Sequence, residues 1–131
     1  SDLSYEDMMG DKKLSEIYFA EVVRIDTIAS RSCFVVNLAA KTPDIAYQKR
    51  ILWVDQERFT PMKEELYAKS GTLLKSTTLS DFRMIAGRWY PFQILYKDVL
   101  KSGKGTEFIV DSIEFDQPID DYIFSKASLR K

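Results

Sequence analysis

Between Trp53 and Pro91, short apolar runs alternate with even shorter polar turns, and this spacing constrains the fold more than any other feature of the chain. Gly71 and Gly87 occupy two of these turns, where a tight hairpin favours a residue that tolerates positive φ. Connections this short can join only neighbouring antiparallel strands, because a parallel crossover needs many more residues. The stretch therefore predicts a β-meander.

The same pattern extends the meander in both directions and predicts a mainly β protein with about eight antiparallel strands. The expected strands cover residues 17–26, 33–40, 47–55, 61–69, 72–79, 81–85, 89–97 and 106–115. Short helical turns are expected near the two termini, over Ser4–Met9 and after Asp120–Asp121, because Ser and Asp cap the first turn of a helix. A sheet of this size must curl or pack on another layer to bury its apolar face.

Two of the expected strands allow their faces to be assigned. The segment Ile51–Val54 is apolar at every position, which predicts a central strand covered on both sides. In the strand over residues 89–97, apolar side chains recur at every second position and predict one apolar face. They are Tyr90, Phe92, Ile94 and Tyr96.

The residue inventory excludes the commonest catalytic machinery. The sequence contains no histidine, which removes Ser-His-Asp and Cys-His nucleophilic sites and the commonest zinc ligand. Its single cysteine, Cys33, excludes an intramolecular disulfide and an all-cysteine metal site, and its apolar surroundings predict a buried, inert thiol. We therefore expect no catalytic residue, no metal and no cofactor.

Charge and aromatic content leave two further alternatives to weigh. A net charge of −1 argues against nucleic acid as a partner, because nucleic-acid-binding proteins usually carry a surplus of basic residues. Stacking of bases on an aromatic row of the sheet would also need basic residues on the same face, and the Tyr90–Tyr96 face has none. Adjacent carboxylates such as Glu64–Glu65 point to opposite faces of a strand and cannot converge unaided. A small hydrolase or isomerase that joins carboxylates from different strands stays an alternative.

Several segments carry a family likeness that covers nearly the whole chain. They are SCFVVNLAAK, RILWVDQERFTPMKEELYAKSGTLLKS, SDFRMIAGRWYPFQILYKDV and FIVDSIEFDQPIDDYIFSKASLRK. With its W-V-D-x-E-x-F-x-P-x-K run and its G-R-W-x-P turn, the chain resembles bacterial outer-membrane lipoprotein-sorting proteins of the LolA-like type.

The resemblance implies a fold and a place in a longer protein. Members of this family are longer, and the chain resembles their C-terminal half, so residues 1–131 are expected to form a single half-barrel domain that lacks the N-terminal part of the full protein. The implied fold is an open β-barrel in the bacterial periplasm. The implied function is the binding and transport of lipoproteins or other acylated ligands on the concave apolar face, with an inner-membrane transporter or an outer-membrane acceptor as partner.

Such a site needs only a dry, adaptable surface, because burial of each methylene group of an acyl chain contributes about 0.8 kcal/mol. The inward-facing set expected from strand alternation and the resemblance is Phe34, Val36, Trp53, Leu66, Leu79, Phe92, Ile94, Tyr96 and Phe108. Because an uncovered apolar face drives association, the surface Tyr90–Tyr96 also predicts self-association. The alternative is a periplasmic lipid-sensing domain on the same fold, which needs the same cavity.

Overall fold

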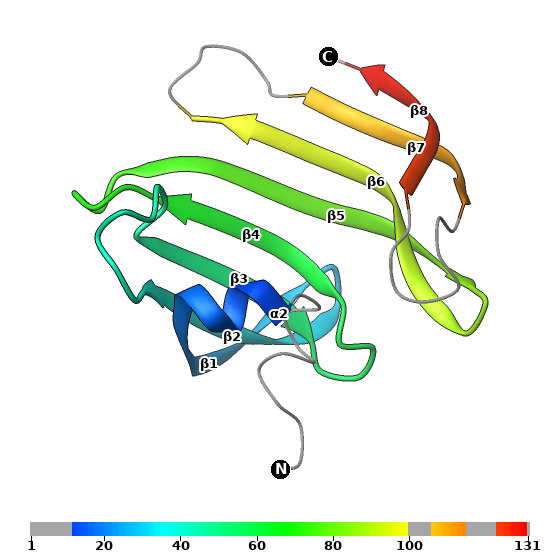
Figure 1. Ribbon diagram of the computed structural model, residues 1–131. Helices are drawn as coiled ribbons and strands as arrows, with labels where there is room; N and C mark the ends of the chain where they lie inside the picture. The colour runs from blue at the N-terminus through cyan, green and yellow to red at the C-terminus, as the bar shows by residue number, and fades with distance from the viewer. Residues whose placement is uncertain (1–11, 100–105, 115–122, 131) are drawn as a thin grey trace.

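The computed structural model describes residues 12–99, 106–114 and 123–130 and shows a single antiparallel sheet preceded by a short helix (Figure 1). The elements are α2 (Lys12–Ile17), β1 (Tyr18–Ile28), β2 (Arg31–Ala40), β3 (Lys49–Asp55), β4 (Pro61–Tyr67), β5 (Leu73–Ile85), β6 (Arg88–Asp98), β7 (Thr106–Glu114) and β8 (Ile123–Arg130). Spatial order follows chain order, β1 to β8. The predicted meander is confirmed.

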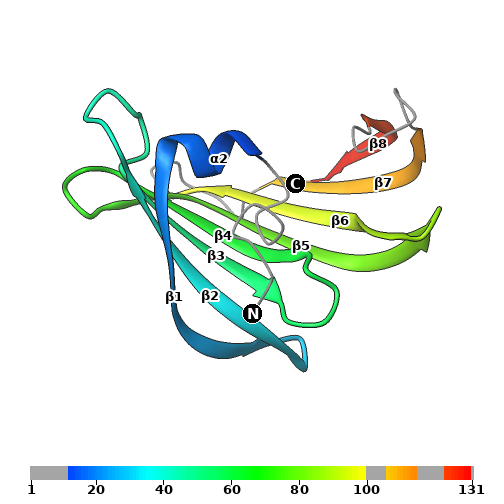
Figure 2. The same ribbon diagram turned by 60° about the horizontal axis from the view of Figure 1, so that its bottom comes forward.

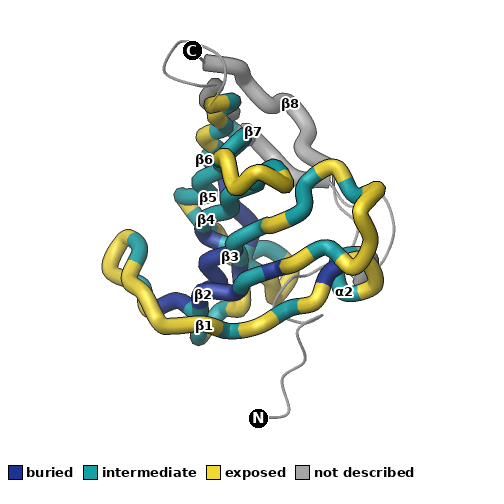
Figure 3. The backbone as a smooth tube through the Cα atoms, turned by 90° about the vertical axis from the view of Figure 1, so that its left-hand side faces the viewer, coloured by how far each residue is buried: buried dark blue, intermediate teal, exposed yellow. Residues whose placement is uncertain are grey.

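The sheet curls without closing, so β1 and β8 form its two edges (Figure 2). Seen along the strands in Figure 3, it forms an open curve, with α2 on the inner side. We call this inner side the concave face and the opposite side the convex face. Leu14 of α2 packs against a cluster of buried residues on the concave face. The mainly β, open half-barrel architecture expected from the sequence is therefore confirmed.

Two of the three buried clusters of the described residues lie on opposite faces of β2 and β3, and the third surrounds Tyr90 and Phe92 of β6. Val36 pairs with Leu52 on the concave face, whereas Val35 pairs with Trp53 on the convex face. All four side chains are buried, because the concave cluster lies under α2 and the convex cluster includes Met62 of β4. Figure 3 shows the buried residues gathered along these two strands. The prediction that β3 is a central strand covered on both sides is confirmed.

The hairpin between β5 and β6 has the two-residue turn that its sequence predicts. Ala86 and Gly87 both adopt positive φ, 51° and 81°, as a type I′ turn requires. Gly71, in the turn before β5, also has positive φ. These turns align long strands directly against each other, with Ile85 opposite Arg88 and Leu79 opposite Ile94.

Two of the expected strands, 72–79 and 81–85, are one strand in the structure. The division at Ser80–Asp81 was wrong, because the ladder continues through it, with Ser80 opposite Gln93 and Phe82 opposite Pro91. Asp81 itself adopts φ of 52°, a left-handed conformation that Asp tolerates better than most residues. The polar residues Ser80 and Asp81 therefore mark a local irregularity inside a continuous strand and not a turn.

The C-terminal helical turn was also wrong, because Ile123 begins strand β8. Seven residue pairs join β7 to β8, among them Ser112 with Ser125 and Val110 with Ala127. The neighbouring strand supplies a ladder of hydrogen bonds that an isolated helical turn lacks. The structure therefore has the expected number of eight strands, but two expected strands are merged in β5 and β8 is a strand that was not expected. The N-terminal turn expected over Ser4–Met9 lies outside the described residues.

Candidate functional site

The concave face brings together most of the inward-facing set expected from the sequence. Directly opposed residues in antiparallel strands share a face, so the register assigns each side chain. Val36 is opposite Leu52, Leu66 is opposite Arg50, and Leu79 is opposite Ile94. Alternation along β2 and β6 completes the group. Its members on the concave face are Phe34, Val36, Leu66, Leu79, Phe92, Ile94 and Tyr96.

Trp53 does not belong to this group. It pairs with Val35, so its ring lies on the convex face, where it packs with Cys33 and Met62. The Trp53 indole N–H donates to Asp26 at 3.3 Å, and the ammonium group of Lys63 lies 4.8 Å from the ring centroid. The sequence-based assignment fails because β3 is apolar on both faces. Phe108 pairs with Ile94 through its backbone, and its side chain lies outside the described residues.

Burial divides the concave group into core and accessible surface. Val36 is fully buried and Phe92 is 4% exposed, so these side chains pack the interior. Phe34, Leu66, Leu79, Ile94 and Tyr96 are half-buried. Because Leu79 and Ile94 are directly opposed, they form the centre of an accessible apolar strip across β5 and β6. This strip is a partly accessible apolar part of the concave face.

One end of the concave face is polar, and sequence analysis does not single it out. We call it the polar end; its residues are Tyr47, Arg50, Glu64, Lys75, Tyr96 and Asp98. The Arg50 guanidinium donates to the Glu64 carboxylate through Nε, at 3.0 Å, and through Nη2. Charged residues on a strand read from sequence as solvent-facing, and only the cross-strand register reveals that these two share the inner face.

Lys75 is held among aromatic side chains at the polar end. Its ammonium nitrogen lies 5.3 Å from the ring centroid of Tyr47. The pKa of Lys75 is raised above its usual value, mostly by a hydrogen bond with the Tyr47 side chain and secondly by one with the Tyr96 side chain. This amine therefore carries its charge at neutral pH. The hydroxyl group of Tyr18 donates to the backbone carbonyl of Tyr47 at 2.7 Å and fixes that segment against β1.

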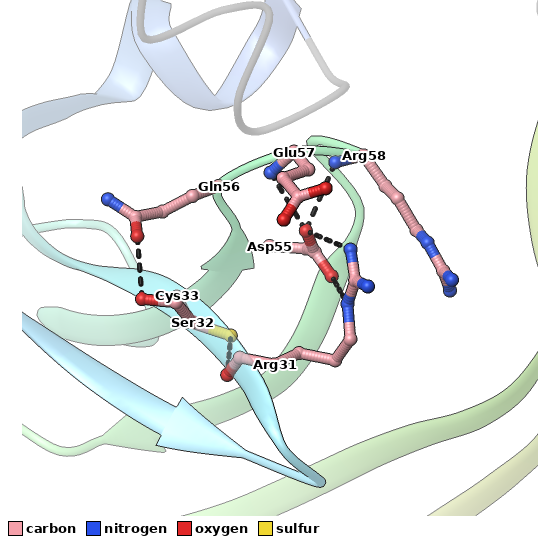
Figure 4. A network of polar contacts seen from close by, with 7 residues as sticks. All are labelled: Arg31, Ser32, Cys33, Asp55, Gln56, Glu57 and Arg58. Carbon is pink, nitrogen blue, oxygen red and sulfur yellow. Dashed lines mark hydrogen bonds and ion pairs between the residues drawn. The ribbon is translucent and has the colours of Figure 1, made fainter.

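A second polar network braces the turn between β3 and β4 (Figure 4). The buried Asp55 carboxylate accepts two hydrogen bonds from Arg31, at 2.6 and 3.0 Å. It also accepts the backbone N–H groups of Glu57 and Arg58, at 2.8 and 3.1 Å. Burial alone raises the pKa of Asp55, but the hydrogen bonds from Arg31, Arg58 and Glu57 outweigh it and lower the pKa to about 2. This aspartate is therefore a structural residue.

The same turn contacts the β5–β6 hairpin through a cation–π pair. The guanidinium carbon of Arg58 lies 3.9 Å from the ring centroid of Trp89. Arg58 belongs to the W-V-D-x-E-x-F-x-P-x-K run, and Trp89 belongs to the G-R-W-x-P turn. The segments that carry the two motifs are thus in direct contact, through a residue at one of the variable positions of the first motif.

Glu64 and Asp98, the two carboxylates at the polar end, lie on strands that are not adjacent, unlike the convergent pair that a hydrolase or isomerase would require. Glu64 and Asp98 both lie on the concave face, but β5 separates their strands by about 10 Å. Glu64 is paired with Arg50, and Asp98 is opposite Lys75. Among the described residues, no group of His, Cys, Asp and Glu side chains is placed to hold a metal ion. No helix within residues 12–99, 106–114 and 123–130 is long and apolar enough to cross a membrane.

Comparison with known proteins places this geometry in a recognised fold. Residues 1–131 match the model of a protein family described as "-like: Uncharacterized protein", and the chain belongs to that family. No curated protein matches the chain.

Three solved structures share the fold. A LolA superfamily protein from Nitrosomonas europaea is 36% identical, with a TM-score of 0.60 over 69% of this chain and 41% of its own. A domain described as an outer membrane lipoprotein-sorting protein, from Vibrio parahaemolyticus, is 22% identical, with a TM-score of 0.63 over 76% and 42%. A DUF1329 family protein from Desulfovibrio piger is 21% identical, with a TM-score of 0.61 over 75% and 41%.

These neighbours bear out the resemblance read from the motifs: the chain has a LolA-like fold. It spans about two fifths of the length of the structures it matches, 41–42% of each.

Proposed function

We propose that the chain binds acylated or otherwise apolar ligands on the concave face of its half-barrel. The observation that carries this proposal is the accessible strip at Leu79 and Ile94, which are half-buried and directly opposed on the inner side of a curled sheet. Leu66 of the neighbouring strand β4 lies on the same face. Each methylene group that such a strip removes from water contributes about 0.8 kcal/mol, so a handful of contacts suffices for binding without any catalytic group.

The LolA-like fold supports a more specific form of the proposal. The ligand is then a lipoprotein acyl chain or a similar lipid in transit through the bacterial periplasm, with an inner-membrane transporter or an outer-membrane acceptor as partner. The chain is part of a longer protein in this proposal, since it spans 41–42% of each structure that it matches. A lipid-sensing role on the same fold is the alternative, and a pulldown that recovers a membrane-bound regulator instead of a transporter favours it.

A direct titration tests ligand binding. The 131-residue chain is mixed with an environment-sensitive fluorescent fatty acid, and we expect a saturable rise in fluorescence because the probe leaves water for the apolar strip. Unlabelled oleate reverses the rise by competing for the same surface. A folded chain, verified by circular dichroism, that gives no saturable signal contradicts the proposal.

Self-association is a further proposal, and the structure changes the surface on which it rests. Tyr90 and Phe92 are each only 4% exposed, whereas Phe19 on the edge strand β1 is 65% exposed. The outer edge of β1 is the first edge of the sheet, and such edges pair readily with a second copy. In an antiparallel pair centred after Val22, Glu21 of one copy lies opposite Arg24 of the other.

We therefore expect a concentration-dependent dimer in sedimentation velocity. Arg24→Glu places like charges opposite each other in that pairing and weakens the dimer. A chain that sediments as a monomer at every concentration contradicts self-association. A dimer that Arg24→Glu leaves unchanged contradicts the β1 edge as its surface.

A further inference from the structure

The polar end of the concave face is built from rows of directly opposed side chains that cross neighbouring strands. Two adjacent rows of side chains cross β3 to β6 at this end. The first row is Arg50, Leu66, Lys75 and Asp98, and the second is Leu52, Glu64, Thr77 and Tyr96. The rows continue along the same face to Leu79 and Ile94, so polar and apolar surfaces adjoin each other. A ligand on the apolar strip therefore extends towards the polar end.

The polar end is more enclosed than the charged pair at the other end of the face. The Arg50 and Glu64 side chains are 19% and 20% exposed, whereas those of Arg83 and Asp81 are 58% and 46% exposed. Removing charged groups from water costs free energy. At the polar end, the charged side chains of Arg50 and Glu64 lie on the same face as the apolar strip at Leu79 and Ile94. The placement favours a role in recognising the polar part of a ligand.

The charges at the polar end balance, which restricts the ligand head group. Arg50 is paired with Glu64, and Lys75 is directly opposite Asp98 across β5 and β6. Because Glu64 and Asp98 offset the two cations, no net positive charge is left to hold an anionic head, and an alkyl head leaves the hydrogen-bonding groups unused. A head with hydroxyl and ester oxygens accepts from Lys75 and donates to carboxylates, so an uncharged, oxygen-bearing head is the best match.

We propose that the polar end binds an uncharged, hydroxyl-bearing head group of an amphiphile whose chain lies over Leu79 and Ile94. An acylglycerol is the simplest molecule of this class. The distance from Lys75 to Leu79 along β5 is about 13 Å, so a long acyl chain reaches the strip while the head stays with Lys75. This inference rests on the proposed function, because it requires the apolar strip to hold a chain.

Three competitors with one oleoyl chain and different heads test the inference. Monoolein, methyl oleate and oleoyl lysophosphatidic acid each displace the fluorescent fatty acid from the 131-residue chain, below their micelle concentrations. We expect monoolein to displace the probe at about a tenfold lower concentration than methyl oleate, which lacks hydroxyl groups. Lysophosphatidic acid is expected to compete no better than monoolein, because its phosphate approaches Glu64 and Asp98.

Variants locate the effect at the polar end. Lys75→Met keeps the aliphatic stem and is expected to reduce the monoolein preference to about twofold or less. Tyr96→Phe removes one hydroxyl and keeps the ring, and it is expected to reduce the monoolein preference about threefold. Lys97→Met is the control, because Lys97 is exposed on the opposite face, and the tenfold preference should persist.

The outcomes separate this inference from the function on which it rests. Equal displacement by monoolein and methyl oleate, or tighter competition by lysophosphatidic acid, contradicts the head-group assignment while leaving acyl binding intact. A monoolein preference that survives both Lys75→Met and Tyr96→Phe also contradicts it. Absence of saturable probe binding contradicts the proposed function and this inference together.

Discussion

Replacing Asp55 by Asn is expected to lower the free energy of unfolding by about 2–3 kcal/mol at neutral pH. The buried carboxylate accepts hydrogen bonds from two nitrogens of Arg31 and from the backbone of the β3–β4 turn. An amide retains one oxygen acceptor, loses the ion pair and brings two donors that the site does not need. Urea denaturation of both proteins at pH 7 measures the difference.

The same substitution has a defined pH dependence. The pKa of Asp55 is lowered from 3.8 to about 2, so its contribution to stability is fully present above pH 3.8 and is lost as the pH falls through 2. This shift corresponds to about 2 kcal/mol. We therefore expect the stability gap between the wild type and Asp55→Asn to narrow strongly when both are compared near pH 2. A gap that is unchanged by acid contradicts the assignment.

Asp81→Asn provides the matched control for Asp55→Asn. Asp81 also pairs with an arginine, Arg83, at 2.8 Å, but both side chains are about half exposed. Asn tolerates the positive φ of this position as well as Asp does. We expect a loss below about 0.5 kcal/mol, because exposed ion pairs contribute little. Equal losses in the two variants would show that burial does not set the contribution of Asp55.

The fold could be predicted largely because turn chemistry and strand spacing are local properties. Gly87 with its preceding Ala86 forms a two-residue hairpin turn, and that turn alone sets the register of β5 against β6. Asp81 could not be interpreted in this way. Its left-handed conformation lies inside a strand that tertiary pairing keeps continuous, so a local polar signal was mistaken for a turn.

The candidate site was only partly predictable, because face assignment depends on pairing between strands. Alternation placed Ile94 and Tyr96 on one face of β6, and the register agrees. It could not choose between Leu52 and Trp53 in a strand that is apolar throughout, and only the pairing of Leu52 with Val36 decides. Arg50 and Glu64 compensate each other across β3 and β4, so two charged side chains lie on the inner face, which their sequence positions alone do not reveal.

Adjacent residues of β6 allow the sharpest test of which face binds the ligand. Ile94 is half-buried on the concave face opposite Leu79, and Leu95 is 36% exposed on the convex face. Ile94→Glu places a charge in the apolar strip and removes contacts equivalent to two or three methylene groups, about 2 kcal/mol. We expect the fluorescent fatty acid to bind about thirtyfold more weakly to Ile94→Glu and within about twofold of wild type to Leu95→Glu.

Stability measurements separate a lost ligand contact from a lost fold. Each variant is first compared with the wild type by circular dichroism and urea denaturation, and Ile94→Ala replaces Ile94→Glu if the charged variant does not fold. Alanine removes three carbons without adding a charge. Because Ile94 is only half-buried, about half of their transfer free energy is lost, and we expect about tenfold weaker probe binding. Equal probe affinity in the concave and convex variants contradicts binding on the concave face. Weaker binding in Leu95→Glu alone would transfer the site to the convex face, where Trp53 lies.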